Sequence, residues 1–329
     1  MNHSRARICV CIIALLCMGS IVGSSAMAQT RTRPARIGAL TASWGPTSPM
    51  LGLRDGLLEL GYREGEDFVL GVRFTQGDID ALPDAARQLV QYGVDLLFTS
   101  EDAPAKAAQQ ATSQIPIVFT AVSDPVELGL IQSFASPGGN ITGVTELSLQ
   151  LAPKRLQIFQ EMIPQLKRVF LPYNANEAYA VKVARVWREA ARHLGMELVE
   201  RPVHTVEEAR AALLQGPKGA VDGILQPPSA SLNLAGQVLE VSKQQGIPTM
   251  FEDAFWVERG ALVSYGPEFY ESGRQAARLV DKILKGAKPA DIPVEVNPKI
   301  EFAINLKVAN DLGLSIAPAV LYQADRIIR

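Results

Sequence analysis

Five acidic residues stand directly after predicted strands, where an α/β protein gathers the side chains of a site. They are Glu101, Asp102, Asp124, Glu252 and Asp253. Paired carboxylates can transfer protons in catalysis, and a single carboxylate can bind a ligand amine. Structural roles compete with both. Asp124 precedes Pro125, the pattern of a helix N-cap, and Glu101 and Asp102 can complement the positive end of an alanine-rich helix.

Hydroxyl and aromatic residues follow the same strands. Backbone N–H groups at helix starts can bind an anion, and Ser100, Ser123 and Ser229 place hydroxyl donors beside them. Although aromatic residues make up only 6% of the chain, several fall in or beside these loops, among them Phe255. They predict stacking walls for a flat or apolar ligand, or else core positions. The predicted ligand-binding residues are Trp44, Ser100, Glu101, Asp102, Ser123, Asp124, Tyr173, Asn174, Tyr179, Ser229, Asp253, Trp256 and Tyr265.

Common catalytic motifs are missing from the sequence after residue 28. It contains no G-x-G-x-x-G, Walker A, G-x-S-x-G or H-E-x-x-H pattern, which argues against nucleotide-binding enzymes, hydrolases and zinc proteases. His193 fits a helix C-terminus, where an imidazole complements the dipole, and His204 precedes a capping box formed by Thr205 and Glu208. We expect no enzymatic activity, no cofactor and no metal.

Strands and helices alternate along the chain, a pattern that predicts parallel sheets with crossover helices. The first series has predicted strands at 36–40, 68–74, 94–99, 115–121 and 141–145, and helices through 53–60, 79–92 and 103–113. The second series has strands at 169–172, 196–202, 223–226, 247–251 and 261–265, and helices at 179–194, 206–214, 234–245 and 270–284.

The predicted fold class is α/β, with two Rossmann-like lobes and a ligand cleft between them. Lobe 1 comprises residues 36–143 and 267–291, and lobe 2 comprises residues 144–266 and 292–316. Ligands of parallel sheets bind beyond the carboxyl ends of the strands, where the connecting loops gather. The loops expected to line the cleft are 41–47, 100–103, 122–124, 173–179, 226–231, 252–256 and 264–267.

Residues 1–28 have the pattern of a secretory signal peptide. Arg5 and Arg7 precede an apolar run at 8–18 that is too short to span a bilayer, and Ala26 and Ala28 form an A-x-A cleavage pattern. We expect cleavage after Ala28 and export to the periplasm. All three cysteines lie in this segment, so the exported chain would rely on a large core rather than on disulfides.

The charges of the chain are nearly balanced and scattered. It has 32 basic and 34 acidic residues, with a net charge of −2. No basic block of the kind that binds phosphate backbones or anionic lipid occurs, so we expect no nucleic-acid partner.

Short motifs along nearly the whole exported chain resemble one family. They are Arg54-Asp55-Gly56-Leu57, Leu60-Gly61-Tyr62, Ile115-Pro116-Ile117-Val118-Phe119, Asp124-Pro125, Pro137-Gly138-Gly139-Asn140, Thr142-Gly143-Val144, Ile283-Leu284-Lys285-Gly286, Pro289-Ala290-Asp291-Ile292-Pro293 and Asn305-Leu306-Lys307. Together they resemble the ABC-transporter substrate-binding proteins whose best-characterised members bind tryptophan or tyrosine. The resemblance implies a type I periplasmic-binding-protein fold, a small-molecule ligand and delivery to an ABC permease in the inner membrane.

One position departs from the family pattern. Where members usually place a Gly/Thr-rich loop with a small hydroxyl residue, this sequence has Ser100-Glu101-Asp102. Two carboxylates there would repel a ligand carboxylate, which argues against an amino acid held in the usual orientation.

The resulting expectation is a monomeric, periplasmic solute-binding component of an ABC importer. It would bind a small organic ligand, such as an amino acid or an aromatic acid, by hinge closure. Two alternatives remain open: a periplasmic sensing subunit that signals to a membrane receptor, and a hydrolase that uses Glu101, Asp124 and Asp253. The secretory signal and the missing DNA-binding helices exclude a LacI-type repressor.

Overall fold

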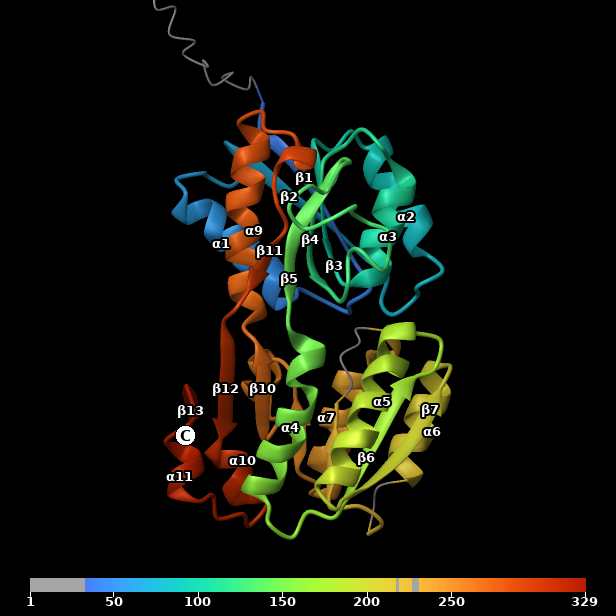
Figure 1. Cartoon of the computed structure of the whole chain (residues 1–329), viewed down its shortest axis with the longest axis vertical. Coiled ribbons are helices and arrows are strands. Elements are labelled where there is room, and N and C mark those ends of the chain that lie inside the picture. The colour runs from blue at the N-terminus through green and yellow to red at the C-terminus, as the bar shows by residue number, and fades with distance from the viewer. Residues whose placement is uncertain (1–32, 217–218, 227–230) are drawn as a thin grey trace, which may run out of the picture. The chain divides into compact units, whose positions relative to one another are not determined.

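The structure is a computed structural model, and it describes residues 33–216, 219–226 and 231–329. Two sheets with helices on both faces organise this part of the chain (Figure 1). The predicted α/β fold with two Rossmann-like lobes is therefore confirmed. Among the described residues, no helix has both the length and the apolar character needed to cross a membrane.

The first lobe contains a parallel six-stranded sheet in the order β11-β5-β4-β3-β1-β2. Helices α1 and α9 pack together over one face, and α2 and α3 cover the other (Figure 1). The bounds are β1 (Ala35–Thr41), α1 (Ser48–Glu59), β2 (Phe68–Phe74), α2 (Leu82–Gln91), β3 (Leu96–Ser100), α3 (Asp102–Ala111), β4 (Ile117–Val122), β5 (Ile141–Glu146), α9 (Phe269–Leu284), η2 (Pro289–Asp291) and β11 (Glu295–Asn297).

Glycines allow α1 and α9 to pack backbone against backbone. A Cβ atom added to Gly52 would lie 1.9 Å from the carbonyl oxygen of Tyr270, and one added to Gly273 would lie 2.0 Å from that of Pro49. Any larger residue at either position would force the two helices apart. The close pair fixes α9 against the first lobe, although α9 follows a strand of the second.

The second lobe contains a seven-stranded sheet in the order β13-β12-β10-β9-β8-β6-β7. It is predominantly parallel, but β12 runs antiparallel to β10. The bounds are α4 (Ser148–Met162), β6 (Arg168–Asn174), α5 (Ala178–His193), β7 (Glu197–Val203), α6 (Val206–Gln215), β8 (Gly223–Leu225), η1 (Ser231–Asn233), α7 (Leu234–Gln245), β9 (Thr249–Phe251), α8 (Ala254–Val257), β10 (Val263–Pro267), β12 (Ile300–Asn305), α10 (Leu306–Asp311), α11 (Pro318–Leu321) and β13 (Arg326–Ile328).

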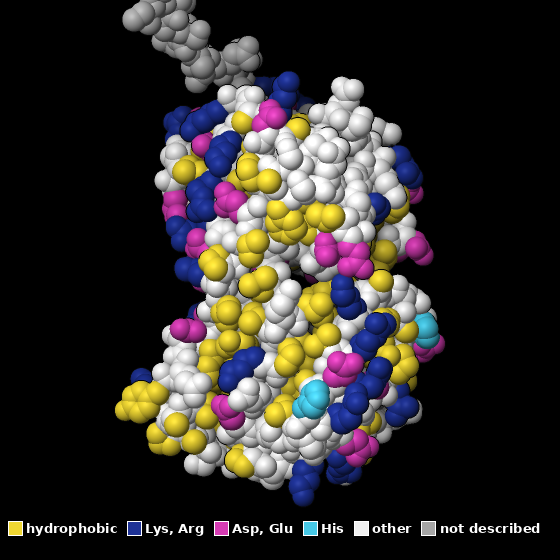
Figure 2. All heavy atoms as spheres, in the orientation of Figure 1, with side chains coloured by type: hydrophobic (Ala, Val, Ile, Leu, Met, Phe, Trp, Pro, Cys, Tyr) yellow, Lys and Arg dark blue, Asp and Glu magenta, His cyan; other side chains and the backbone are white. Residues whose placement is uncertain are grey.

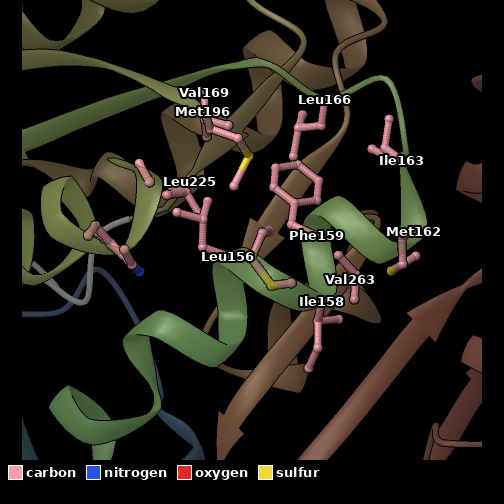
Figure 3. Packing of buried hydrophobic residues seen from close by; sticks show 14 of the residues in the cluster. Leu156, Ile158, Phe159, Met162, Ile163, Leu166, Val169, Met196, Leu225 and Val263 are labelled. Carbon is pink, nitrogen blue, oxygen red and sulfur yellow. The ribbon is translucent and has the colours of Figure 1, made fainter. Parts of the chain in front are cut away.

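Helix α4 anchors the larger core of the second lobe. Its buried Phe159 lies among Leu156, Leu166 and Val169 (Figure 3). The ring packs against Gly223 of β8, where an added Cβ would lie 2.7 Å from the ring. This packing fixes α4 over the sheet, and the first turn of α4 reaches the candidate site.

The chain passes between the two sheets after Glu146, after Pro267 and after Asn297. The predicted segment boundaries at 143/144 and 266/267 fall within β5 and β10, close to the first two passages. The third boundary, predicted at 291/292, needs correction, because β11 pairs with β5 in the first sheet. Residues 292–297 therefore belong to the first lobe, and the chain leaves that lobe at Pro298. The second lobe also extends beyond residue 316, to β13.

Predicted and observed elements agree closely in the strand-helix repeats, and β2 and α7 have their predicted bounds. The prediction contained no helix between 145 and 169, where α4 lies. Pro153 lies inside α4, and an internal proline removes a hydrogen-bond donor and usually ends a helix. Burial of one face of α4 against the sheet outweighs that local cost.

Candidate functional site

A cavity of about 510 Å³ lies where the carboxyl ends of strands from both sheets converge. Residues after β1, β3 and β4 line it from the first lobe, and residues after β6, β8 and β9 line it from the second. Each sheet places its first strand between its second and third, so that the strand order reverses there. Ligands of open α/β sheets bind at such points. Of the seven loops expected to line the cleft, only 264–267 contributes no residue to the wall.

The end of β3 carries the acidic part of the first-lobe wall. Glu101 has φ 78° and ψ 168°, a conformation that is almost restricted to glycine. Both oxygens of the Asp102 carboxylate accept hydrogen bonds from Ser123, Oδ1 from the backbone N–H at 2.8 Å and Oδ2 from the hydroxyl at 2.6 Å. Burial raises the pKa of Asp102 despite these bonds.

Asp124 lies on the same wall and stabilises a turn. Its Oδ1 accepts hydrogen bonds from the N–H groups of Val126 and Glu127 at 3.1 and 2.9 Å. The segment that follows forms turns and not a helix, so Asp124 stabilises a turn where its pattern predicted a helix N-cap. Nearby, the Nζ of Lys106 donates to the carbonyl of Leu128 at 2.7 Å.

The second-lobe wall is built around a buried ion pair. Nη2 of Arg155, on α4, lies 3.4 Å from Oε1 of Glu252, and the two side chains are 1% and 5% exposed. The Ser148 hydroxyl donates to the same Oε1. Glu252 and Ser148 line the cavity and Arg155 lies behind them. Burial raises the pKa of Tyr179, whose hydroxyl bonds with Ser148.

Asp253 links the second-lobe wall to the first lobe. Its Oδ2 accepts a hydrogen bond from Ser48 Oγ at 2.8 Å, and its Oδ1 accepts from the Phe255 N–H at 2.9 Å. Burial raises the pKa of Asp253 to about 6, against the opposing effect of these two bonds. The second bond makes Asp253 the N-cap of α8.

Glu146 occupies the first passage between the sheets. It accepts a hydrogen bond from the Ala121 N–H at 3.3 Å and bonds with the Ser272 hydroxyl, and burial raises its pKa to about 8. Asn297, at the third passage, donates to Ser272 Oγ at 2.9 Å and to the Glu268 carbonyl at 3.0 Å. A single polar cluster thus joins the three connecting segments, in which the chain passes between the two lobes.

The structure brings about half of the predicted ligand-binding residues to the cavity: Ser100, Glu101, Asp102, Ser123, Asp124, Tyr179 and Asp253. Asn174 is buried and organises the loop after β6 by accepting from the Asn176 N–H. Trp44 is 47% exposed and lies beside Gly77. Ser229 lies outside the described residues. The ligand-binding role of all of these residues stays a prediction.

The remaining predicted aromatic residues pack against the cores of the second lobe. Tyr173 packs on the core beneath α4 and α5, and Tyr265 meets Phe302 edge-on at 6.1 Å in that core. Trp256 packs with Phe251 and Phe255 on the opposite face of the sheet. A stacking wall made of these side chains is therefore not present at the cavity, and Tyr179 is joined there by Phe269 instead.

Several residues of the cavity wall were not among the predicted ligand-binding residues. Glu146, Ser148 and Phe269 belong to the connecting segments or start a helix just after one. Glu252 is one of the five acidic candidates, and its place at the end of β9 is the same signal that pointed to Asp253. In the described part of the chain, no group of three His, Cys, Asp or Glu side chains could hold a metal ion.

The two histidines that the structure describes, His193 and His204, lie where the sequence predicted. His193 is the last residue of α5. Beside His204, the Thr205 hydroxyl accepts from the Glu208 N–H at 3.1 Å, and Glu208 Oε2 accepts from the His204 N–H at 2.8 Å. The predicted capping interaction is confirmed.

A family model described as ABC transporter substrate binding protein matches residues 47–328. A tyrosine-binding protein of Clostridioides difficile strain R20291 is 30% identical over 257 residues, which cover 77% of this chain and 73% of the relative.

Three solved structures with 25–30% sequence identity share the fold. A conserved domain protein from Vibrio cholerae has 30% identity and a TM-score of 0.80, with 90% of this chain and 100% of that chain covered. A domain from Streptococcus pneumoniae in complex with L-Trp has 27% identity and a TM-score of 0.78 over the same shares. A ligand-free, open substrate binding protein from Clostridium difficile has 25% identity and a TM-score of 0.61, with 90% and 99% covered.

Proposed function

Because the chain belongs to the ABC transporter substrate binding protein family, we propose that it is the solute-binding component of an ABC importer. It captures a small organic molecule between its lobes and delivers it to a permease in the inner membrane. The cavity carries this proposal. Its volume of about 510 Å³ lies in the range of small-molecule sites, and both lobes line it. The names of the relatives make amino acids and aromatic acids the first classes to test.

The proposed mechanism is closure of the lobes around the ligand. Side-chain contacts between described residues join the lobes at the cavity, among them the hydrogen bond from Ser48 to Asp253 and the ion pair between Lys182 Nζ and Glu127 Oε2 at 2.9 Å. A ligand that contacts both walls would stabilise this arrangement over an open one. The TM-score is lower for the open, ligand-free relative than for the tryptophan complex. This difference supports the existence of two arrangements of the lobes in the family.

We propose binding without turnover by an exported monomer in the periplasm. The carboxyl groups with the largest upward pKa shifts serve the fold: Glu146 binds Ala121 and Ser272, and Asp253 binds Phe255 and Ser48. Charged side chains of both signs are interspersed on the surface seen in Figure 2, which fits a small-molecule ligand better than a nucleic acid.

Thermal unfolding with a ligand library tests the binding role. Protein purified from a periplasmic extract is unfolded and refolded to remove carried-over ligand, and amino acids, aromatic acids, amines and sugars are then added. A true ligand at a hundred-fold excess over its Kd should raise the Tm by about 5 °C or more, because it binds only the folded state. A folded protein that responds to no compound would contradict the proposal.

Two further measurements separate the alternatives. Mass spectrometry after incubation should recover the ligand unchanged, whereas conversion to product would support the hydrolase. Uptake of labelled ligand should be lost when either this gene or that of the partner ATPase is deleted. Normal uptake in the first strain, together with a lost transcriptional response to the ligand, would support the sensing subunit.

A further inference from the structure

We propose that the ligand is a cationic amine without a free carboxylate, and that Glu252 binds its positive group. This inference rests on the proposed binding function and names the chemical class of the ligand. It differs from the amino acid and aromatic acid classes that the family suggests. It is carried by an unpaired acceptor on the cavity wall, by the balance of charge around the cavity and by the apolar residues between the charges.

Glu252 provides the acceptor. Its side chain is 5% exposed and lines the cavity, and Oε1 is engaged by Arg155 and Ser148. Oε2 is buried and has no hydrogen-bond partner among the described residues. A buried carboxylate oxygen without a donor is costly. A ligand N–H group would satisfy it.

The other buried acids around the cavity are already engaged. Both oxygens of Asp102 bind Ser123, and both oxygens of Asp253 accept hydrogen bonds within the protein. Glu146 binds a backbone N–H and the Ser272 hydroxyl. Among the described acids that line the cavity, Glu252 is the one with a buried oxygen that lacks a hydrogen-bond partner.

The charge around the cavity favours a cation. Seven acidic residues line it, against the two lysines Lys106 and Lys182. Negative charge exceeds positive charge even when Glu146 is taken as protonated and Arg155, which lies behind the wall, is added to the two lysines. Both lysines are committed within the protein, Lys106 to the Leu128 carbonyl and Lys182 to Glu127. A ligand carboxylate would have to share a lysine with one of these acceptors while facing the excess of negative charge.

The rest of the wall is suited to an apolar body. Pro49, Ile79, Val122, Leu128, Leu149 and Phe269 line the same cavity. A cavity of about 510 Å³ holds an aromatic or branched alkyl group attached to an ammonium. Apolar contact would supply affinity, and the single charged contact at Glu252 would orient the molecule.

Matched ligands test the charge requirement directly. The probes are tryptamine, tyramine and isoamylamine, the amino acids L-tryptophan, L-tyrosine and L-leucine, and the acids indole-3-propionate, 3-(4-hydroxyphenyl)propionate and 4-methylpentanoate. Calorimetry at neutral pH should show an amine binding at least ten-fold more tightly than its amino acid, and no binding of the acids. The inference is overturned if an amino acid or acid binds as tightly as its amine, or if no amine binds. A hit elsewhere in the wider library would then leave the importer role standing.

Variants locate the cation. Glu252→Gln keeps the shape of the side chain but removes its charge, and should weaken amine binding by about ten- to a hundred-fold. Because this change also breaks the pair with Arg155, Glu101→Gln provides a second reduction of negative charge on the opposite wall and should weaken amine binding by a smaller factor. The matched control is Glu197→Gln on the exposed start of β7. Equal affinity in wild type and both wall variants would overturn the assignment.

Discussion

Ser48 of the first lobe donates a hydrogen bond to Asp253 Oδ2 of the second lobe at 2.8 Å. The acceptor is held in place because its other oxygen caps α8 through the Phe255 N–H. One short contact between fixed groups therefore joins the two walls of the cavity. If ligand binding requires the joined arrangement, the strength of this contact contributes to ligand affinity.

Replacing Ser48 should weaken ligand binding with little loss of stability. Ser48→Ala removes one hydrogen bond to a carboxylate, so we expect the Kd to rise by about ten-fold. Isothermal titration calorimetry with any ligand found by thermal unfolding measures the change. Ser113→Ala, at an exposed position after α3, is the control. Unchanged affinity in Ser48→Ala would show that this bond is absent from the bound state.

Glu146 should make the protein less stable as the pH rises through neutrality. Burial raises its pKa to about 8 in the folded state, from a value of 4.5 for the unperturbed group. The folded protein therefore holds this proton in a pH range where the unfolded chain has lost it. Stability should fall between pH 4.5 and 8, by up to about 1.4 kcal/mol per pH unit.

A neutral variant of Glu146 tests this pH dependence. Glu146→Gln keeps a neutral group with a donor and an acceptor, so its free energy of unfolding should depend less on pH across this window and exceed that of wild type at pH 8. Urea denaturation at pH 5, 6.5 and 8 measures both effects. Glu197→Gln should retain the wild-type slope. A wild-type slope in Glu146→Gln would assign the pH dependence to other groups.

The backbone conformation of Glu101 should lower the stability of the protein, while its carboxylate adds negative charge to the cavity wall. Its φ of 78° and ψ of 168° cost an L-residue about 1–3 kcal/mol, and glycine avoids this cost but loses about 0.5–1 kcal/mol through chain entropy. Glu101→Gly should therefore raise the free energy of unfolding by about 1 kcal/mol and weaken binding of a cation.

A variant of Ala121 separates the effect of Glu101→Gly on stability from its effect on cation binding. It also has a positive φ, 54°, and lines the cavity without a charge. Ala121→Gly should stabilise the protein and leave the preference for a cation intact. Chemical denaturation and ligand titration of the two variants measure this difference, and a loss of stability in Glu101→Gly would contradict the assigned strain.

The sequence predicted the fold well because alternating strand and helix patterns are local. Strand ends also located Ser100, Glu101 and Asp102 at the cavity, since parallel strands end on one edge of a sheet. The aromatic residues could not be assigned in the same way. Tyr173 and Tyr265 lie within strands, where neighbouring side chains point to opposite faces, and both pack on the core beneath α4.

The other differences between the predicted and the observed structure come from contacts between residues far apart in the sequence. The place of β11 in the first sheet depends on hydrogen bonds with β5, about 150 residues earlier in the chain. Likewise, the buried pair of Arg155 and Glu252 depends on α4, whose Pro153 obscures the helical pattern. Neither relationship has a local signal in the sequence.

Asn297 should be essential for the stability of the connecting segments. Its buried amide donates to the Glu268 carbonyl and to Ser272 Oγ, and its Oδ1 accepts from the Lys299 N–H at 3.0 Å. Asn297→Ala leaves these groups without partners in a site closed to water, so we expect a loss of about 2–3 kcal/mol in the free energy of unfolding. Asn310→Ala, at an exposed position in α10, should change stability by less than about 0.5 kcal/mol. Urea denaturation of both variants measures the difference. Equal stability would mean that the three connecting segments are held by their backbone and apolar contacts rather than by this amide.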